Sequence, residues 1–359
     1  MVMWIGIIGL PYSGKTTLFE LLSQRKRSAA ELGKKENTAV VKVWDPRVDF
    51  LSKFFKPKKT TYATLKFTDI KGLSAKATPG ERNKILEEIQ NVDALLWVIR
   101  AFDSPSVPWE SEKLSASQQF EEIKTELMLR DMSVAETRIN RLENAKRKLN
   151  PDEEMELKVL KKIYEYLESE KMLYSSTLGE NELRSISSLG FFTLKPCVAV
   201  INVDEEKFKS KDFPDQEMKE LSWRNSIPLL KICAEMEEEI MELEEGDRKA
   251  FLEDLGVEET GINRLTKVLF SHVGLISFFT VGEDEVRAWQ IKTGTPAKKA
   301  AGKIHSDMER GFIRAEIVKY DDFKRLGSMK EVKSKGLMKL IGKNEIIEDG
   351  DIMEVRFNV

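Results

Sequence analysis

Near the amino end, the chain reads Gly9-Leu10-Pro11-Tyr12-Ser13-Gly14-Lys15-Thr16-Thr17. This run fits the pattern G-x-x-x-x-G-K-[ST], which is typical of a loop that wraps around phosphate groups. The apolar run 4–8 before it has the character of a buried strand, and the apolar spacing of 18–22 after it is that of a helix. Strand, glycine loop and helix are the context that the motif needs. The sequence therefore predicts a phosphate-binding loop.

The residue types in this loop predict its chemistry. The glycines allow a tight turn in which successive backbone N–H groups point at phosphate oxygens, and the following helix adds partial positive charge at its N-terminus. We expect Lys15 to reach the β- and γ-phosphates and the Thr16 hydroxyl to hold Mg²⁺. The residues of this stretch expected to bind the nucleotide are Gly9, Pro11, Tyr12, Ser13, Gly14, Lys15, Thr16 and Thr17.

The composition sets the class of protein. The chain has 359 residues, 41% of them hydrophobic, and a net charge of -3. This length suggests two or three domains. No apolar run approaches the roughly 20 residues of a membrane helix, and the amino end has no signal-peptide pattern. The two cysteines, Cys197 and Cys233, lie in apolar runs, which favours buried thiols in a reducing compartment. We therefore expect a cytoplasmic protein without a membrane partner.

A second phosphate and metal element follows the alternating run 62–69, which ends in Asp69-Ile70-Lys71-Gly72. Asp69 is expected to hold Mg²⁺ through water, and the Gly72 N–H to face the γ-phosphate; with Lys15 and Thr16, Gly72 completes the predicted catalytic set. Leu73 stands where Ras-like enzymes have a glutamine that orients the attacking water. Since leucine makes no hydrogen bond, hydrolysis must position its water through another group.

Residues 24–37 are polar and lie where a GTPase-like protein has its first switch loop. Thr38 is the candidate there for completing the Mg²⁺ shell. Thr38 also fits the simple beginning of a strand that runs to residue 44, and both interpretations stay open.

Residues 118–173 are highly charged, with apolar residues at helical spacing. Asn150-Pro151-Asp152-Glu153 supplies an N-cap, a proline at the first helical position and acidic residues in the first turn. We predict two antiparallel helices joined by a tight turn, forming a coiled-coil arm within an insertion at 115–190. Such an arm either contacts a partner or is a passive insertion.

The base-contacting residues are expected after the apolar run 196–201, which ends in Asn202-Val203-Asp204-Glu205. A GTPase places N-K-x-D here, and the aspartate accepts hydrogen bonds from guanine. In this chain Glu205 replaces that aspartate and Val203 replaces the lysine, so the guanine code is broken and adenine fits better. The next strand is followed by a further expected contact loop. The expected base contacts are Asn202, Val203, Glu205, Ala234 and Glu235.

The pattern changes near residue 277, where mixed strands and helices predict a small α+β domain. We therefore predict a nucleotide-binding domain over 1–276, which includes the insertion 115–190, and a second domain over 277–359. Between Lys324 and Lys343 basic residues outnumber acidic ones. This run is either a patch for a polyanion or ordinary surface.

Over nearly its whole length the chain resembles the Obg-like ATPase (YchF) family. Besides the motifs above, the likeness rests on Asp45-Pro46-Arg47, Lys124-Thr125-Glu126-Leu127, Cys233-Ala234-Glu235-Met236-Glu237, Phe279-Thr280-Val281-Gly282 and Gly311-Phe312-Ile313-Arg314-Ala315-Glu316. The resemblance implies an α/β P-loop NTPase (Ras-like) fold with a mostly parallel sheet and a coiled-coil insertion, followed by a ubiquitin-like α+β TGS domain. It also implies slow, Mg²⁺-dependent hydrolysis of ATP in preference to GTP, ribosome association, and an adenine contact by the Val203 backbone.

The chain departs from the family pattern at four places, one of which is a shortened second switch over residues 74–80. Tyr12 and Ser13 replace the usual Asn-Val of the P-loop, Gly33 falls where the switch threonine is expected, and Trp109 falls where the family has a loop histidine. Three functions therefore stay open: a slow ATPase that regulates translation, a nucleotide-binding module with little or no hydrolysis, and a GTP-binding protein. The expected partners are a purine triphosphate and the ribosome or RNA, reached through the TGS domain or the arm.

Overall fold

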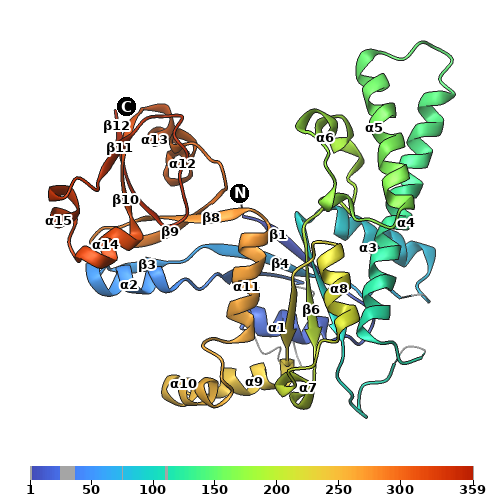
Figure 1. Cartoon of the computed structure of the whole chain (residues 1–359), viewed down its shortest axis with the longest axis horizontal. Coiled ribbons are helices and arrows are strands. Elements are labelled where there is room, and N and C mark those ends of the chain that lie inside the picture. Colours follow the sequence, from blue (N-terminus) through green and yellow to red (C-terminus); the bar gives the residue numbers. More distant parts are fainter. Residues whose placement is uncertain (1, 25–36, 75, 110–111, 359) are drawn as a thin grey trace. The chain divides into compact units, whose positions relative to one another are not determined.

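The computed structural model describes residues 2–24, 37–74, 76–109 and 112–358 (Figure 1). The chain divides into two compact units, of which the first holds residues 3–39 and 66–265 and the second holds 40–65 and 266–359. These units differ from the predicted domains, 1–276 and 277–359, chiefly in the segment 40–65. The structure groups that segment with the C-terminal part of the chain, for the reasons given below.

The first unit is built on a sheet with the strand order β2-β4-β1-β5-β6-β7. Its strands are β1 (Trp4–Ile8), β2 (Thr38–Lys42), β4 (Thr64–Asp69), β5 (Ala94–Arg100), β6 (Cys197–Asn202) and β7 (Leu229–Ile232). The pairs β1–β4, β1–β5, β5–β6 and β6–β7 are all parallel. Every residue of β5 and β6 is buried, as expected for a parallel sheet covered on both faces. The predicted α/β fold class is confirmed.

Helices connect these strands. They are α1 (Lys15–Ser23), α3 (Pro79–Gln90), α4 (Ala116–Glu143), α5 (Pro151–Glu168), α6 (Glu180–Ile186), α7 (Glu205–Lys209), α8 (Gln216–Arg224), α9 (Ala234–Glu242), α10 (Glu245–Asp254) and α11 (Gly261–His272), with 3₁₀ turns at η1 (Leu173–Ser175) and η2 (Ser187–Leu189). In the described part of the chain, no helix has the length and apolar character needed to span a membrane.

The predicted helix pair is present as α4 and α5, which lie side by side in Figure 1. Asn150 caps α5 as predicted, because its side chain accepts from the Glu153 N–H at 2.9 Å while Glu153 accepts from the Asn150 N–H at 3.0 Å. Arg138 of α4 forms a two-pronged ion pair with Glu156 of α5, at 2.8 and 2.7 Å. The apolar stripes of both helices face each other and join the core of the sheet.

Asp131 fixes the base of this helix pair. Its carboxylate is fully buried and accepts from the Phe192 N–H at 3.0 Å and from both the N–H and the hydroxyl of Thr193 at 2.7 Å. The Arg130 guanidinium donates to the same carboxylate at 2.9 Å and lies over the Phe192 ring. Burial raises the pKa of Asp131, although these hydrogen bonds oppose the rise. The carboxylate therefore joins α4 to the segment that leads into β6.

The second unit has its own sheet, in the order β11-β10-β12-β8-β9-β3. Its strands are β3 (Lys59–Thr61), β8 (Leu275–Thr280), β9 (Glu285–Lys292), β10 (Phe312–Lys319), β11 (Lys339–Ile341) and β12 (Asp351–Phe357), and its helices are α2 (Pro46–Phe55), α12 (Ala297–Ile304), α13 (Ser306–Arg310), α14 (Tyr320–Leu326) and α15 (Met329–Ser334). A core forms where Ala297, Ala300 and Ala301 of α12 pack against the sheet.

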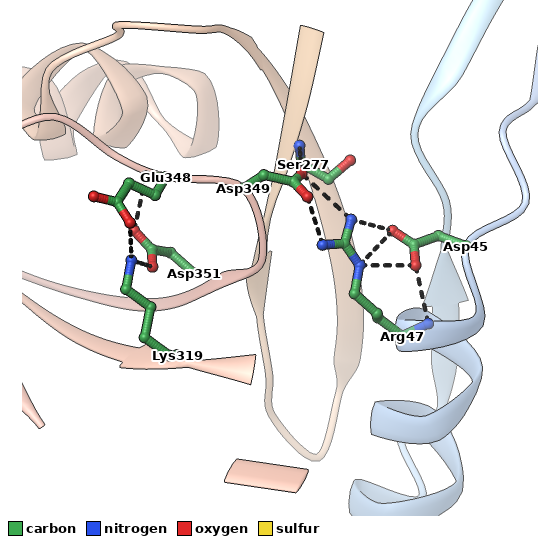
Figure 2. Close-up of polar contacts among 7 residues, drawn as sticks. All are labelled: Asp45, Arg47, Ser277, Lys319, Glu348, Asp349 and Asp351. Atoms are coloured by element: carbon green, nitrogen blue, oxygen red, sulfur yellow. Dashed lines mark hydrogen bonds and ion pairs between the residues drawn. The ribbon is translucent and has the colours of Figure 1, made fainter. Parts of the chain in front are cut away.

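Two contacts explain why the segment 40–65 belongs to this unit. Strand β3 adds to the edge of the sheet in parallel with β9, with Lys59 opposite Glu285. Arg47, close to the beginning of α2, lies between Asp45 and Asp349, and its guanidinium donates to both carboxylates (Figure 2). Asp349 in turn accepts from the Ser277 N–H at 2.9 Å. The Asp-Pro-Arg motif therefore ties α2 to the C-terminal segment.

Candidate functional site

The loop between β1 and α1 has the conformation that its glycines predict. Gly9, Tyr12 and Gly14 have positive φ angles of 156°, 61° and 91°. A Cβ atom on Gly9 would overlap the carbonyl oxygen of Val98, and one on Gly14 would overlap the side-chain amide of Asn202. The loop therefore requires glycine at both positions, where the conformation is left-handed and the space is already filled.

Lys15 and Thr16 meet the second predicted element at this loop. The Lys15 ammonium donates to the carbonyl of Leu10 at 2.6 Å. The same ammonium is close to Gly72, because a Cβ atom placed on Gly72 would lie only 3.0 Å from the Lys15 nitrogen. The Thr16 hydroxyl donates to Asp69 at 2.9 Å. The structure therefore gathers Lys15, Thr16, Asp69 and Gly72 at the carboxyl ends of β1 and β4, where ligands bind in open parallel sheets.

Asn202 links the loop to the predicted base-contacting segments. It lies at the end of β6 and is 6% exposed. Its side-chain amide donates to the Ser13 carbonyl at 3.3 Å and accepts from the Ala234 N–H at 3.2 Å. The sequence predicts Asn202 as a base contact but not as a bridge between two loops, because its partners are distant in sequence.

The two acidic residues of the Asn202–Glu205 motif are both paired with lysines. Asp204 caps α7 by accepting from the Lys207 N–H, and it also accepts from the Lys207 ammonium at 2.8 Å. Burial raises the pKa of Asp204, but the contacts with Lys207 outweigh it and the net shift is downward. Glu205 is exposed and pairs with Lys209 on the same helix. Both carboxylates therefore form ion pairs with lysines of α7.

The three other predicted contacts in this region are two buried residues and one exposed side chain. Val203 is buried, and its N–H donates to the Ile232 carbonyl at 2.9 Å. Ala234 is buried at the beginning of α9, and the Glu235 side chain is exposed. The segments that the sequence predicts to contact the base therefore follow β6 and β7.

Thr38 begins β2, and its hydroxyl lies 3.3 Å from the hydroxyl of Thr68, which also accepts from the indole N–H of Trp4. This placement favours the interpretation of Thr38 as the first residue of a strand over that of a metal ligand. Gly33 and most of the predicted switch loop lie outside the described residues.

Two residues differ in type from those expected in related enzymes: Leu73 stands where Ras-like enzymes have a glutamine, and Trp109 where the family has a loop histidine. Leu73 is 9% exposed, and its N–H donates to the Gly9 carbonyl at 3.0 Å. The guanidinium carbon of Arg100 lies over the ring of Trp109, 4.1 Å from the ring centre. Arg100 is buried and also donates to the carbonyls of Val107 and Pro108. Arg100 therefore holds the loop that contains Val107 and Pro108. The signal for this role in the sequence is a charged residue at the end of an otherwise apolar strand.

The comparisons with known proteins agree with this geometry. Residues 4–138 match the family model described as 50S ribosome-binding GTPase, and residues 275–358 match the model for the C-terminal domain of YchF GTPases, described as a protein of unknown function. The chain is 39% identical to the Ribosome-binding ATPase YchF of Haemophilus ducreyi, with 99% of each chain covered, and 38% identical to that of Bacillus subtilis, with 100% of each covered.

The chain belongs to the YchF family. The structure agrees: the solved structure of the Schizosaccharomyces pombe YchF GTPase superposes with a TM-score of 0.85 at 28% identity, covering 99% of this chain and 97% of that one. The resemblance predicted from the motifs is therefore confirmed along the whole length. Family membership also confirms a nucleotide-binding P-loop protein.

Proposed function

We propose that this YchF-family chain is a slow, Mg²⁺-dependent ATPase that binds the ribosome and regulates translation according to its nucleotide state. The observation that carries the proposal is the meeting of Lys15, Thr16, Asp69 and Gly72 at one glycine loop. Backbone N–H groups and the Lys15 ammonium stabilise charge on the phosphates during in-line attack by water. In this proposal Lys15, Thr16 and Gly72 contact the reacting phosphate.

The metal fits the groups present. Mg²⁺ in proteins is held by one or two side-chain oxygens, phosphate oxygens and water, rather than by a cage of carboxylates. The hydroxyl of Thr16 and the carboxylate of Asp69, 2.9 Å apart, supply such a pair. In the described ranges, no three residues among His, Cys, Asp and Glu are grouped so that they could hold a metal ion. Phosphate oxygens and water would therefore supply the remaining Mg²⁺ ligands. When bound, Mg²⁺ neutralises charge on the β- and γ-phosphates.

Adenine is the proposed base. Guanine presents an N1–H and an exocyclic amine to the aspartate of N-K-x-D, whereas this chain has the longer Glu205 at that position, where it pairs with Lys209. Adenine presents an exocyclic amine that can donate a hydrogen bond to a backbone carbonyl. Since the Val203 N–H is used by Ile232, the contact left to the Val203 backbone is through its carbonyl. Asn202, Ala234 and Glu235 complete the proposed base pocket.

A second candidate function is a nucleotide-dependent binding module that hydrolyses ATP very slowly or not at all. It is favoured by Leu73 and Trp109, because neither side chain has a group that accepts a hydrogen bond from the attacking water. Both candidates bind ATP, and they are separated by phosphate release measured against a variant that lacks the Lys15 ammonium.

The ribosome is the proposed partner because the curated relatives carry the name Ribosome-binding ATPase YchF. Such a partner places the protein in the cytoplasm. The contact is proposed to run through the C-terminal TGS domain or through the arm formed by α4 and α5, and nucleotide state is proposed to control it.

Calorimetric titration with ATP and GTP, each with and without Mg²⁺, tests the function. We expect ATP to bind at least about tenfold more tightly than GTP, equal to about 1.4 kcal/mol, and Mg²⁺ to strengthen both. Tight GTP binding with weak ATP binding would overturn the adenine assignment. No affinity for any purine triphosphate would remove the function altogether.

Asn202→Ala tests whether the bridge between the two loops organises the site. It removes the hydrogen bonds to Ser13 and Ala234, each contributing about 1 kcal/mol. We expect ATP affinity to fall about tenfold in the same titration. Asn225→Ala is the matched control, because Asn225 is similarly buried and, among the described residues, its side chain donates only to the Leu221 carbonyl of α8. Equal ATP affinity in both variants would contradict the bridging role.

A further inference from the structure

An open cavity of about 500 Å³ lies in the first unit beside β7, the last strand in the order of that sheet. It is bounded by α7 and the loop after it, by β7, by the segment between α10 and α11, and by the first turn of α11. Its apolar lining consists of Phe208, Pro214, Leu229, Leu230, Leu255 and Val257. A cavity of this size with mainly apolar walls is typical of sites that hold small organic ligands.

This cavity is separate from the predicted nucleotide site. Among the described residues that line it, none is expected to contact phosphate, metal or base. The cavity meets β7 at residues 229–231, whereas Ala234 and Glu235 follow the end of that strand. A ligand in the cavity would therefore be a second ligand and not part of a bound ATP.

Two cations, Lys231 and Arg264, line the cavity, and neither forms an ion pair with a described residue. The Lys231 ammonium donates to the carbonyls of Lys207, Ser210 and Phe213 at 3.0, 2.7 and 3.2 Å. An ammonium has three N–H donors, and these bonds use all of them. Lys231 therefore brings positive charge to the cavity wall but no donor for a ligand.

Arg264 has donors that its neighbours do not use. One guanidinium nitrogen donates to the Lys231 carbonyl at 3.0 Å, and the Nε atom is buried without an acceptor in the described part of the chain. The Glu237 carboxylate of α9 forms no ion pair with Arg264 within the described ranges, and it accepts instead from the N–H groups of Gly261 and Ile262. Since a guanidinium has five N–H donors, Arg264 can pair with a ligand.

The charges in this wall favour a negatively charged ligand. Burial lowers the pKa of Lys231, and the neighbouring cations Arg264 and Lys219 lower it further. Like charges held near one another without a counter-charge repel, and each also costs free energy to bury. An anion beside Arg264 and Lys231 would offset both costs, whereas a neutral ligand would offset neither.

We propose that this cavity binds a small carboxylate carried on an apolar body. The Arg264 guanidinium pairs with the carboxylate, and the apolar walls cover the body. A guanidinium matches the two oxygens of a carboxylate in a bidentate pair. A phosphate monoester brings a third oxygen and more negative charge, for which Lys231 has no N–H group left. This second ligand goes beyond the proposed function, which concerns ATP alone.

Calorimetric titration of the full chain with phenylbutyrate tests the proposal. Three comparison ligands separate the parts of the interaction: phenylbutyramide has the same body without the charge, acetate has the charge without the body, and phenyl phosphate replaces the carboxylate by a phosphate. Each titration is repeated in the presence of saturating ATP and Mg²⁺, so that binding at the nucleotide site is detected as competition.

Three variants locate the ligand. Arg264→Gln removes the proposed partner of the carboxylate, and Val257→Trp fills the cavity while keeping Arg264 in place. Arg248→Gln is the matched control, because Arg248 is also a half-buried arginine that donates to backbone carbonyls, those of Ile240 and Leu243, and it does not line this cavity.

We expect phenylbutyrate to bind at least about tenfold more tightly than phenylbutyramide, acetate or phenyl phosphate, because charge-assisted hydrogen bonds are stronger than neutral ones and the apolar body is buried. Arg264→Gln should bring the ratio of the phenylbutyrate and phenylbutyramide affinities to about one. This ratio reports the lost charge pair even where the substitution lowers stability. Val257→Trp should weaken both ligands about tenfold, since the indole takes the space of the apolar body. Arg248→Gln and added ATP should change neither affinity.

Four results would overturn the proposal. The first is no binding of phenylbutyrate, or binding equal to that of its amide. The second is an unchanged ratio in Arg264→Gln, or unchanged affinity in a folded Val257→Trp. The third is displacement of phenylbutyrate by ATP, which would place the ligand at the nucleotide site. The fourth is tighter binding of phenyl phosphate, which would exclude a carboxylate as the ligand.

Discussion

Lys15→Ala is expected to weaken ATP binding about 100-fold and to remove phosphate release. The Lys15 side chain is 8% exposed and its ammonium donates to Leu10 at 2.6 Å, beside Gly72. When a triphosphate enters, this ammonium exchanges the loop carbonyl for phosphate oxygens. A charge-assisted hydrogen bond contributes about 1.5–3 kcal/mol, and two such bonds to the β- and γ-phosphates account for a loss of this size.

Lys71→Ala is the matched control for this variant. Lys71 lies one residue before Gly72 but is exposed and pairs with Glu81 at 2.6 Å. Calorimetry with ATP and Mg²⁺ should detect no more than a twofold change, and phosphate release should persist. If Lys15→Ala bound ATP as the control does, the loop would not be the triphosphate site. If binding fell while phosphate release in the unaltered protein was already absent, the binding-module function would be favoured over the ATPase.

Asp131→Ala is expected to lower the free energy of unfolding of the first unit by about 3–5 kcal/mol, the usual cost of removing one partner of a buried charged network. The substitution leaves the Phe192 and Thr193 N–H groups and part of Arg130 buried without an acceptor. Because these groups join α4 to the segment before β6, the base of the helix pair should loosen first. Urea unfolding followed by far-ultraviolet circular dichroism measures the change.

Glu136→Ala controls for loss of an acidic side chain from the same helix. Glu136 is exposed and forms no ion pair with the described residues, so its removal should change stability by less than about 0.5 kcal/mol. A change below 1 kcal/mol in Asp131→Ala would mean that water replaces the carboxylate, and the anchoring role would be wrong.

The strand, loop and helix at the amino end can be predicted from sequence because every signal there is local. The apolar run of β1, the glycines of the loop and the spacing of α1 act within 20 residues. Asp69 and Gly72 are predictable for the same reason, since a strand and a following turn fix both. The cap of α5 at Asn150 is also a local pattern. The residue identities of the site itself remain a prediction that the binding experiments above test.

Features that depend on distant pairing are beyond sequence reasoning. Nothing near Lys59 indicates that its short strand pairs with a strand beginning at Glu285. Likewise, the sequence predicts Asn202 as a base contact because its motif is local. Its hydrogen bonds to Ser13 and Ala234 depend on how three strands align, which no local pattern indicates. For this reason the pattern assigns residues 40–65 to the nucleotide-binding domain, whereas the structure groups them with the C-terminal unit.

The second unit is built from two segments that are distant in sequence, so it cannot complete its fold during synthesis until the later segment has been made. Thr61 of β3 and its hydrogen-bond partner Glu285 are separated by 224 residues. At about 5–20 residues per second, the early segment waits roughly 10–45 s for that partner to be synthesised. During this interval Phe50, Phe54 and Phe55 have not yet met Tyr320 and Phe323. We therefore expect the aromatic side chains of α2 to stay exposed in the nascent chain, and to be a binding site for chaperones, until synthesis is nearly finished.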